Sequence, residues 1–386
     1  MEPIRLLCVG IGGYANVYLD SLLSRQEPDF VIAGFVDPAA ENARHFAPLQ
    51  ALGVPRYVSM EEFYARDRAD LAILTTPTNF HTRQILCALA NGSNVLCEKP
   101  LSGVSADETV LLDAARAAGK FVMIGYQWSY TKAILDLKAD IQAGRYGQPV
   151  LLKSRVFWPR SREYYARGGG WGGRLRAKDG TVINDSVVSN GTAHYLHNML
   201  YVLGEPGRSR EAVSVECDLL RANEIENFDT AVVRFAVEGG GTGLLVVSHA
   251  TRENVDPVFE YRFTGGTVSY TTESAEIVGV LADGTRISYG DPLANVTGKV
   301  DVAMAACRLP SYAPPCGVEA AAPQVRCVEQ IQTHPIREFR RSLLRFWEED
   351  GQHYRSVEGL DDLLRQCYEE ERLLSQLPQW EGLVEP

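Results

Sequence analysis

The sequence predicts two consecutive domains, an α/β domain with a parallel sheet and then an α+β domain with an open, mostly antiparallel sheet. In the first part of the chain, apolar β-prone runs alternate with amphipathic stretches. Later, between Val213 and Tyr289, short alternating runs follow one another and glycine-rich turns separate them. Because 386 residues are too many for one ordinary core, we expect domains at residues 1–125 and 126–386.

Strands and helices alternate throughout the first domain. Strands are expected at residues 5–9, 30–36, 56–59, 71–74, 94–97 and 121–125, and helices at residues 15–23, 39–52, 60–65, 81–92 and 105–118. This order is typical of a doubly wound parallel sheet covered by helices on both faces. Such sheets bind ligands past the carboxyl ends of their strands. Four polar or special segments fall at these ends, namely Gly10–Ala15, Asp37, Thr75–His81 and Glu98–Pro100.

The first of these segments matches G-x-G-x-x-A between a strand and a helix. Gly10 allows a sharp turn, Gly12 leaves the backbone open to a pyrophosphate, and Ala15 allows the helix to pack closely on the sheet. An ordinary strand–helix turn is the alternative, but the flanking strands and Asp37 favour a dinucleotide site of the Rossmann type. Asp37 suits the ribose hydroxyls of NAD and repels the 2′-phosphate of NADP, while Arg44 keeps NADP open. The expected cofactor-binding residues are Gly10, Ile11, Gly12, Gly13, Tyr14, Ala15, Asp37, Thr75, Thr76, Pro77, Asn79, His81, Glu98, Lys99 and Gln127.

Composition narrows the class of protein. The chain is 45% hydrophobic and 23% charged, with a net charge of −11, which argues against nucleic acid as the main partner. No apolar run of about 18 residues occurs, so no membrane helix is expected. We see no signal peptide, and the eight scattered cysteines fit reduced thiols. These observations predict a cytoplasmic globular protein.

The second domain begins with a helix at residues 131–143 and a strand at 150–158, followed by a helix at 190–203. Further strands are expected at residues 213–219, 230–237, 242–248, 258–263, 267–270, 277–281 and 286–289. Residues 291–323 are interpreted as an irregular excursion, and residues 324–348 and 356–376 as closing helices that pack back on the first domain. One face of the sheet is expected to pack on helices. The other face is expected to form a homodimer or homotetramer.

Three segments resemble the glucose-fructose oxidoreductase, inositol dehydrogenase and rhizopine-catabolism family, abbreviated Gfo/Idh/MocA. They are Gly10–Ala15, Thr75–Lys99 with the run N-V-L-C-E-K-P that ends at Pro100, and Asn190–Gly204. The resemblance implies a nucleotide-binding domain, an α+β domain with an open sheet, and NAD(P)-dependent chemistry at a carbinol carbon. The usual substrates in the family are sugars, cyclitols and related polyols.

The run Glu98-Lys99-Pro100 carries the chemistry that this resemblance implies. A lysine at the end of a buried strand lies in a low dielectric, which lowers its pKa and suits it to proton transfer or carbonyl polarisation. Glu98 is expected to orient Lys99 or to contact the nicotinamide ribose. The alternative is a surface lysine at a strand end. In the family the bond before the proline is often cis.

The family motif D-x-G-x-H-x-x-D is only partly matched, since the chain reads N-G-T-A-H-Y-L-H from Asn190 to His197. His194 matches the histidine and is the expected acid or base. Asn190 and His197 replace the two aspartates, so a base role at Asn190 is lost, although its amide can still bind a hydroxyl. We expect Asn190 and His194 on one helix face. The alternatives are a helix N-cap for Asn190 and a core histidine for His194. No metal is expected, because ligands at suitable spacing are missing around His194 and His197.

A basic, aromatic-rich stretch runs from Arg155 to Lys178. Arginine forks suit anions, and aromatic faces suit sugar rings. We expect this stretch to cover the site and to select an anionic or heavily hydroxylated sugar, with a solvated or oligomer-contact loop as the alternative. The expected substrate-binding residues are Lys99, Trp158, Tyr165, Trp171, Arg174, Asn190, His194 and His197.

These features predict an NAD(P)-dependent sugar or polyol dehydrogenase or ketoreductase with Lys99, His194 and Asn190 as its catalytic residues. Two alternatives remain at this point. One is glycoside cleavage by transient oxidation, in which NAD stays bound. The other is a nucleotide-binding sensor without catalysis. The sugar-like substrate and the direction of the reaction are left open.

Overall fold

The computed structural model of the chain describes residues 2–26 and 28–385. By its internal contacts the chain divides into two compact units. The first unit contains the chain up to Tyr130, together with Pro206–Arg208 and Asn295–Ala322. The second unit contains Thr131–Glu205, Ser209–Ala294 and the chain from Pro323 onward. The first unit therefore extends past residue 125 and takes back a segment from late in the chain.

The first unit contains a six-stranded parallel sheet in the order β3-β2-β1-β4-β5-β6. This is the strand order of a doubly wound dinucleotide-binding fold, and it confirms the predicted fold class. The strands are β1 (Ile4–Val9), β2 (Phe30–Val36), β3 (Arg56–Tyr57), β4 (Leu71–Leu74), β5 (Asn94–Cys97) and β6 (Val122–Ile124). The helices between them are α1 (Ala15–Leu23), α2 (Phe46–Ala51), α3 (Met60–Tyr64), α4 (His81–Ala90) and α5 (Asp107–Ala118).

One helix of this unit differs from the prediction. The single helix expected at residues 39–52 is a 3-10 turn, η1 (Ala40–Asn42), followed by α2, and Ala43 between them has an extended backbone. Pro48 explains the later start of α2. In a helix from residue 39 it would remove an interior hydrogen bond, whereas in the first turn of α2 its missing N–H has no helical partner to lose.

Residues 291–323 were expected to be irregular, and this prediction is wrong. They contain the helix α9 (Gly298–Ala306), the first turns of α10 (Val318–Ile331) and a connecting stretch. Within the first unit, α9 packs beside β5 and the 3-10 turn η3 (Gln127–Tyr130). Arg25 forms an ion pair with Asp301 on α9 at 2.5 Å, which joins this late segment to the end of α1.

The second unit is built on a nine-stranded mixed sheet, in the order β14-β13-β12-β11-β7-β10-β9-β8-β15. Its pairs are antiparallel except for β7 with β10 and β8 with β15. The strands are β7 (Pro149–Phe157), β8 (Ala212–Arg221), β9 (Thr230–Val237), β10 (Thr242–Ser248), β11 (Val255–Phe263), β12 (Gly266–Thr271), β13 (Glu276–Leu281), β14 (Arg286–Gly290) and β15 (Ile336–Glu338).

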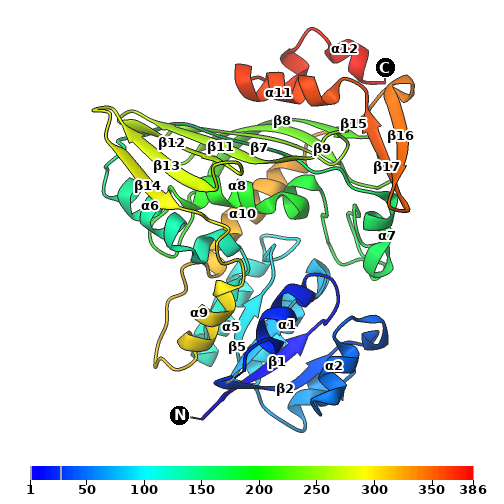
Figure 1. Ribbon diagram of the computed structural model, residues 1–386, viewed down its shortest axis with the longest axis vertical. Coiled ribbons are helices and arrows are strands. Elements are labelled where there is room, and N and C mark those ends of the chain that lie inside the picture. Colours follow the sequence, from blue (N-terminus) through cyan, green and yellow to red (C-terminus); the bar gives the residue numbers. More distant parts are fainter. Residues whose placement is uncertain (1, 27, 386) are drawn as a thin grey trace. The chain divides into compact units, whose positions relative to one another are not determined.

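Helices lie against both faces of this sheet (Figure 1). On one face lie α6 (Lys132–Gln142) and α8 (Ala193–Tyr201). On the other face, Leu244 and Val246 of β10 share a buried cluster with residues of α11 (Leu360–Glu370). Part of the face expected to be an oligomer surface is therefore covered by the chain itself. The last helices are the 3-10 turn η6 (Leu374–Gln376) and α12 (Trp380–Leu383).

The helix expected at residues 324–348 is shorter in the structure, where α10 ends at Ile331. Pro335, which cannot continue a helix, follows shortly after. The chain then forms β15, the 3-10 turn η5 (Arg341–Leu343) and a hairpin of β16 (Leu344–Glu349) and β17 (Gln352–Val357). Asp350 and Gly351 connect the two hairpin strands with φ values of 51° and 70°. Two positive φ angles in an Asp-Gly pair are typical of a two-residue type I′ turn.

Candidate active site

The glycine turn after β1 leaves an open, polar cradle at the start of α1. Gly10 has φ +79°, and a Cβ atom at Gly12 or Gly13 would meet nothing within 4 Å. The N-terminus of α1 has no side-chain cap. Among the described residues, no hydrogen bond is recorded for the amide N–H groups of Gly12, Gly13 and Tyr14. Free amide groups at a helix N-terminus fit a pyrophosphate.

Asp37 lies at the end of β2 and is joined to this cradle. Its Oδ2 accepts a hydrogen bond from Ile11 N at 3.0 Å, and its Oδ1 accepts one from Ala39 N at 2.9 Å. Arg44, which had kept NADP open, forms an ion pair with Asp20. The guanidinium close to Asp37 belongs to Arg56, which donates to Pro38 O at 3.1 Å and pairs with Glu41.

The side chain of His81 holds the turn that follows β4. Its Nδ1 lies 2.8 Å from Pro100 O and its Nε2 lies 2.9 Å from Thr76 O, so the ring joins this turn to the end of β5. Burial lowers the pKa of His81. Thr75 Oγ1 donates to Gly10 O at 2.7 Å. The partly exposed residues of the turn are Thr75, Thr76, Pro77, Asn79 and Phe80.

Glu98 lies in a buried polar cluster at the end of β5. Its Oε1 accepts a hydrogen bond from Tyr18 on α1 and forms an ion pair with Lys299 Nζ on α9 at 2.6 Å. Lys299 also donates to Gly125 O at 2.8 Å, and its side chain is fully buried. Tyr14, one turn before Tyr18, donates to Gln127 Oε1 at 2.8 Å.

Burial by itself raises the pKa of Glu98, but Lys299 and Tyr18 outweigh it and hold the pKa below the ordinary value. Burial lowers the pKa of Lys299 by more than Glu98 raises it. Glu98 is thus held as a carboxylate, and its Oε2 accepts the backbone N–H of Lys99 at 3.2 Å. Lys99 itself is half-buried, and the Lys99–Pro100 peptide bond is cis.

In the second unit, Asn190 lies in a π-helical turn, η4 (Val187–Gly191), and not in the helix that carries His194. Thr192 separates the two with φ −118° and ψ 18°, so the expected shared helix face is not formed. Asn190 does not act as an N-cap either, since Ser186 caps η4. Its Nδ2 donates to Asp185 Oδ1 at 2.8 Å.

The two histidines of α8 lie in different surroundings. His194 is partly exposed in the first turn of the helix. His197 is 1% exposed and stacks on Tyr201 with ring centroids 5.2 Å apart. Burial and the nearby Lys138 hold the pKa of His197 well below its ordinary value. His194 is thus the accessible histidine of α8, whereas His197 lies in the core.

A third histidine, which the sequence analysis did not select, lies against Gly191, the residue after Asn190. His249 follows β10, and its Nδ1 lies 3.2 Å from Tyr165 Oη. A Cβ atom at Gly191 would lie only 2.4 Å from His249 Nε2, so glycine is required there. No partner is recorded for this Nε2 among the described residues. Burial, and then Arg160 and Arg167, hold the pKa of His249 well below its ordinary value.

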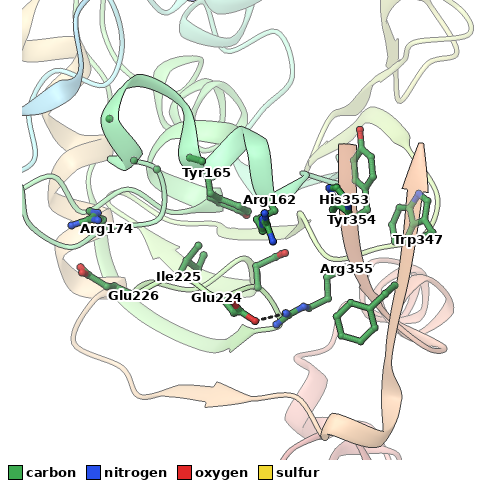
Figure 2. Close-up of a pocket in the computed structure, with 16 residues that line it drawn as sticks. Arg162, Tyr165, Arg174, Glu224, Ile225, Glu226, Trp347, His353, Tyr354 and Arg355 are labelled. Carbon is green, nitrogen blue, oxygen red and sulfur yellow. Dashed lines mark hydrogen bonds and ion pairs between the residues drawn. The ribbon is translucent and has the colours of Figure 1, made fainter. Parts of the chain in front are cut away.

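The basic stretch after β7 folds into α7 (Arg162–Gly170) and a glycine-rich loop. Trp158 Nε1 donates to Asp256 Oδ1 at 3.2 Å. Arg167 lies over the rings of Tyr164 and Trp171, at 3.4 and 4.9 Å from their centroids. Most of the expected sugar-binding aromatics are thus already engaged by neighbours. Arg174 and Tyr165 line a cavity instead (Figure 2).

Several important partners were missed by the sequence analysis, and only some had a signal. Tyr18 lies one turn after Tyr14 on the predicted helix, and His249 follows a predicted strand. The sequence alone could therefore have identified both as candidate site residues. Lys299 lay in the stretch interpreted as irregular, and Asp185 carried no motif. Among the described residues, no group of three or more His, Cys, Asp or Glu side chains is arranged to hold a metal ion. No described helix is both long and apolar enough to cross a membrane.

Comparison with known families decides the class of protein. Residues 4–126 match the family model described as oxidoreductase family, NAD-binding Rossmann fold. Residues 134–269 match the GFO/IDH/MocA C-terminal domain. The chain belongs to the Gfo/Idh/MocA oxidoreductase family. The first unit of this Gfo/Idh/MocA protein is accordingly an NAD-binding Rossmann domain, and the open cradle at Gly12 and the carboxylate of Asp37 fit that cofactor.

Curated relatives match only part of their own length. The chain is 30% identical over 158 residues to inositol 2-dehydrogenase of Mycolicibacterium smegmatis, which covers 39% of this chain and 44% of the relative. It is 29% identical over 218 residues to a putative UDP-kanosamine synthase oxidoreductase subunit of Amycolatopsis mediterranei, covering 56% of each. The chain thus spans about half the length of these relatives.

Solved structures share the fold over more of the chain. The WlbA dehydrogenase from Chromobacterium violaceum, in complex with NADH and UDP-GlcNAcA, matches with a TM-score of 0.68 at 23% identity. The match covers 86% of this chain and 94% of that one. An oxidoreductase from Agrobacterium radiobacter, in complex with NAD+, L-tartaric acid and magnesium, matches with a TM-score of 0.68 at 16% identity, covering 85% and 95%. At these identities the likeness concerns the fold alone.

Proposed function

We propose that this oxidoreductase transfers a hydride between nicotinamide and a carbinol or keto carbon of a sugar, sugar acid or cyclitol. The observation that carries the proposal is the end of β5, where Lys99 follows a carboxylate held in place by Tyr18 and Lys299. The backbone N–H of Lys99 donates to Glu98 Oε2 at 3.2 Å, so the paired carboxylate also fixes the backbone at Lys99. Bound NAD supplies the hydride acceptor or donor.

The proposal gives separate roles to Lys99, His194 and Asn190. During oxidation, Lys99 and His194 take up and pass on the proton of the substrate hydroxyl, as general acid–base groups. Asn190, whose Nδ2 is held by Asp185, uses its amide to bind a neighbouring hydroxyl. His197 is left out of the substrate contacts because of its burial.

The test is a panel of sugars, sugar acids and inositols with NAD and NADP, read as absorbance of the reduced nicotinamide. Lys99→Met and His194→Ala are each expected to lower kcat by about 10²–10⁴-fold while NADH binding stays within a few-fold. Lys132→Met is the matched control, because its side chain is 85% exposed. Full kcat in both active-site variants would contradict the proposal, and turnover without release of NADH would favour transient oxidation instead.

A further inference from the structure

The second unit contains a cavity of about 860 Å³ between α7, the loop Asn223–Glu226 and the hairpin β16–β17 (Figure 2). This volume lies in the range of cavities that hold small-molecule ligands. Its lining is rich in arginine and aromatic side chains and includes Arg162, Tyr165, Arg174, Trp347, Tyr354 and Arg355. Tyr354 stacks on Trp347 with ring centroids 5.0 Å apart, and Arg252 lies over the Trp347 ring at 4.3 Å from its centroid, so these rings are already packed against neighbours.

Most arginines of the basic stretch are occupied by neighbours and do not line this cavity. Arg160 and Arg167 lie over the ring of Tyr164, at 4.8 and 3.4 Å from its centroid. Arg176 donates to Gly180 O at 2.9 Å. The two arginines that do line the cavity from this stretch, Arg162 and Arg174, are therefore the ones left to act on a ligand.

Among the described residues, these two guanidinium groups have no ion pair shorter than 3.9 Å. Arg355 on the hairpin is neutralised by Glu224 at 2.7 Å. The ion pair recorded for Arg162 is with the adjacent Glu163, at 3.9 Å, and its side chain is 79% exposed. For Arg174, the described residues provide no ion pair. Glu226 also lines the cavity, and its Oε2 accepts the backbone N–H of Leu175 at 3.1 Å.

The cavity wall is joined to a proposed substrate residue by hydrogen bonds within the same unit. Asp185 N donates to Arg174 O at 2.9 Å, and Gly173 N donates to Asp185 Oδ2 at 2.5 Å. The other oxygen of Asp185 holds the amide of Asn190. An occupant of the cavity that moved the Arg174 loop would therefore also act on Asn190.

We propose that this cavity binds the carboxylate or phosphate group of an anionic sugar, through Arg162 and Arg174. Charge-assisted hydrogen bonds from planar guanidinium groups recognise both anions. That the ligand is a sugar rests on the proposed function, whereas the anion site itself does not. In a chain of net charge −11, two such arginines provide local attraction for an anion.

Isothermal titration calorimetry of the full chain with saturating NADH, which cannot accept a hydride from the probes, tests this site. The probes are D-glucuronate, D-glucose 6-phosphate and neutral methyl glucoside. Both anions are expected to bind at least about tenfold more tightly than the neutral sugar, and the preference should weaken as salt is added. The tighter of the two anions identifies carboxylate or phosphate as the natural group.

Single substitutions test whether Arg162 and Arg174 cause the preference for anions. Arg162→Gln and Arg174→Gln are each expected to reduce anion affinity by about tenfold. Arg176→Gln, from the same stretch but outside the cavity, should leave the affinity unchanged. Glu226→Gln removes the opposing charge and should strengthen anion binding, so the site remains testable even if an arginine variant fails to fold. Thermal unfolding of every variant checks folding.

Two results would overturn the inference: equal binding of charged and neutral probes, or an anion preference that survives loss of both arginines. Calorimetry reads binding without turnover, so the inference and the proposed function fail separately. Dehydrogenase activity without anion preference removes the cavity site alone. Anion binding without turnover on any sugar removes the dehydrogenase assignment alone.

Discussion

The ammonium group of Lys299 lies 2.6 Å from Glu98 Oε1, although the two residues are 201 positions apart in the chain. Both side chains are buried in the first unit, and Tyr18 donates a hydrogen bond to the same carboxylate oxygen. A buried ion pair loses solvation on both sides, so its partners depend strongly on each other. The Glu98 carboxylate next to Lys99 is thus held by α9, a helix from a distant part of the chain.

Replacing one partner of this pair should destabilise the protein more than replacing both. Lys299→Met leaves Glu98 buried without its cation, and we expect a loss of about 3–5 kcal/mol in the free energy of unfolding. The double variant Glu98→Gln/Lys299→Met should recover most of it. Urea denaturation measures both, with Lys132→Met as the exposed control. A Lys299→Met protein as stable as the parent would show that the pair does not form.

The same pair predicts how stability depends on pH. The folded pKa of Glu98 lies below its ordinary value of 4.5, because Lys299 and Tyr18 outweigh the effect of burial. The folded protein therefore binds fewer protons than the unfolded chain, and the ionised carboxylate stabilises it above pH 4.5. This stability is lost as the pH falls through the folded pKa.

Glu98→Gln isolates this contribution, since glutamine resembles the protonated acid. The difference in unfolding free energy between the parent and Glu98→Gln should be largest near neutral pH and shrink below pH 4.5. Thermal or urea unfolding at several pH values measures it. A difference that stays constant down to the acid range would mean that Glu98 does not titrate in the folded state as described.

Restoring the family aspartate at Asn190 should not improve the enzyme. The amide Nδ2 of Asn190 donates to Asp185 Oδ1 at 2.8 Å, and Asn190→Asp would put two carboxylates at this distance. They would repel each other and share a proton, so we expect lower stability at neutral pH that recovers on acidification, and no gain in kcat/KM.

The exchange variant Asp185→Asn/Asn190→Asp is the matched control for this pair. It keeps one amide and one carboxylate, so it should regain stability relative to Asn190→Asp. Unfolding midpoints at two pH values and kcat/KM on the best substrate of the panel provide the measurements. Higher kcat/KM in Asn190→Asp would show that this position needs a base.

Asp37 should govern the choice between the two nicotinamide cofactors. Its carboxylate is anchored by Ile11 N and Ala39 N, at the end of β2. Asp37→Asn removes the charge while keeping the shape, so NADH should bind roughly tenfold more weakly and NADPH should lose its electrostatic penalty. Fluorescence titrations with both reduced cofactors measure the ratio. Asp113→Asn, at a 67% exposed side chain on α5, is the control and should leave it unchanged.

Much of the fold follows from short-range signals, and these were read correctly. The predicted bounds of β4, β5, β9 and β10 coincide with the structure, because apolar runs bounded by turn residues define a strand locally. The errors fall where a local rule was overlooked. Pro48 favours a later start for α2, and the Asp350-Gly351 turn forms a hairpin where a helix was expected.

The candidate site divides in the same way. A glycine turn, an acid at the end of β2 and the run from Glu98 to Pro100 depend on adjacent residues, so the sequence alone identified the nucleotide cradle and Lys99. The pairing of Glu98 with Lys299 and the separation of Asn190 from His194 by a π-helical turn were decided by tertiary structure. Tertiary structure also decided which arginines of the basic stretch line the cavity, namely Arg162 and Arg174. Motifs are local, whereas the partner of a buried charge depends on which distant segments pack around it, and no spacing along the chain encodes that.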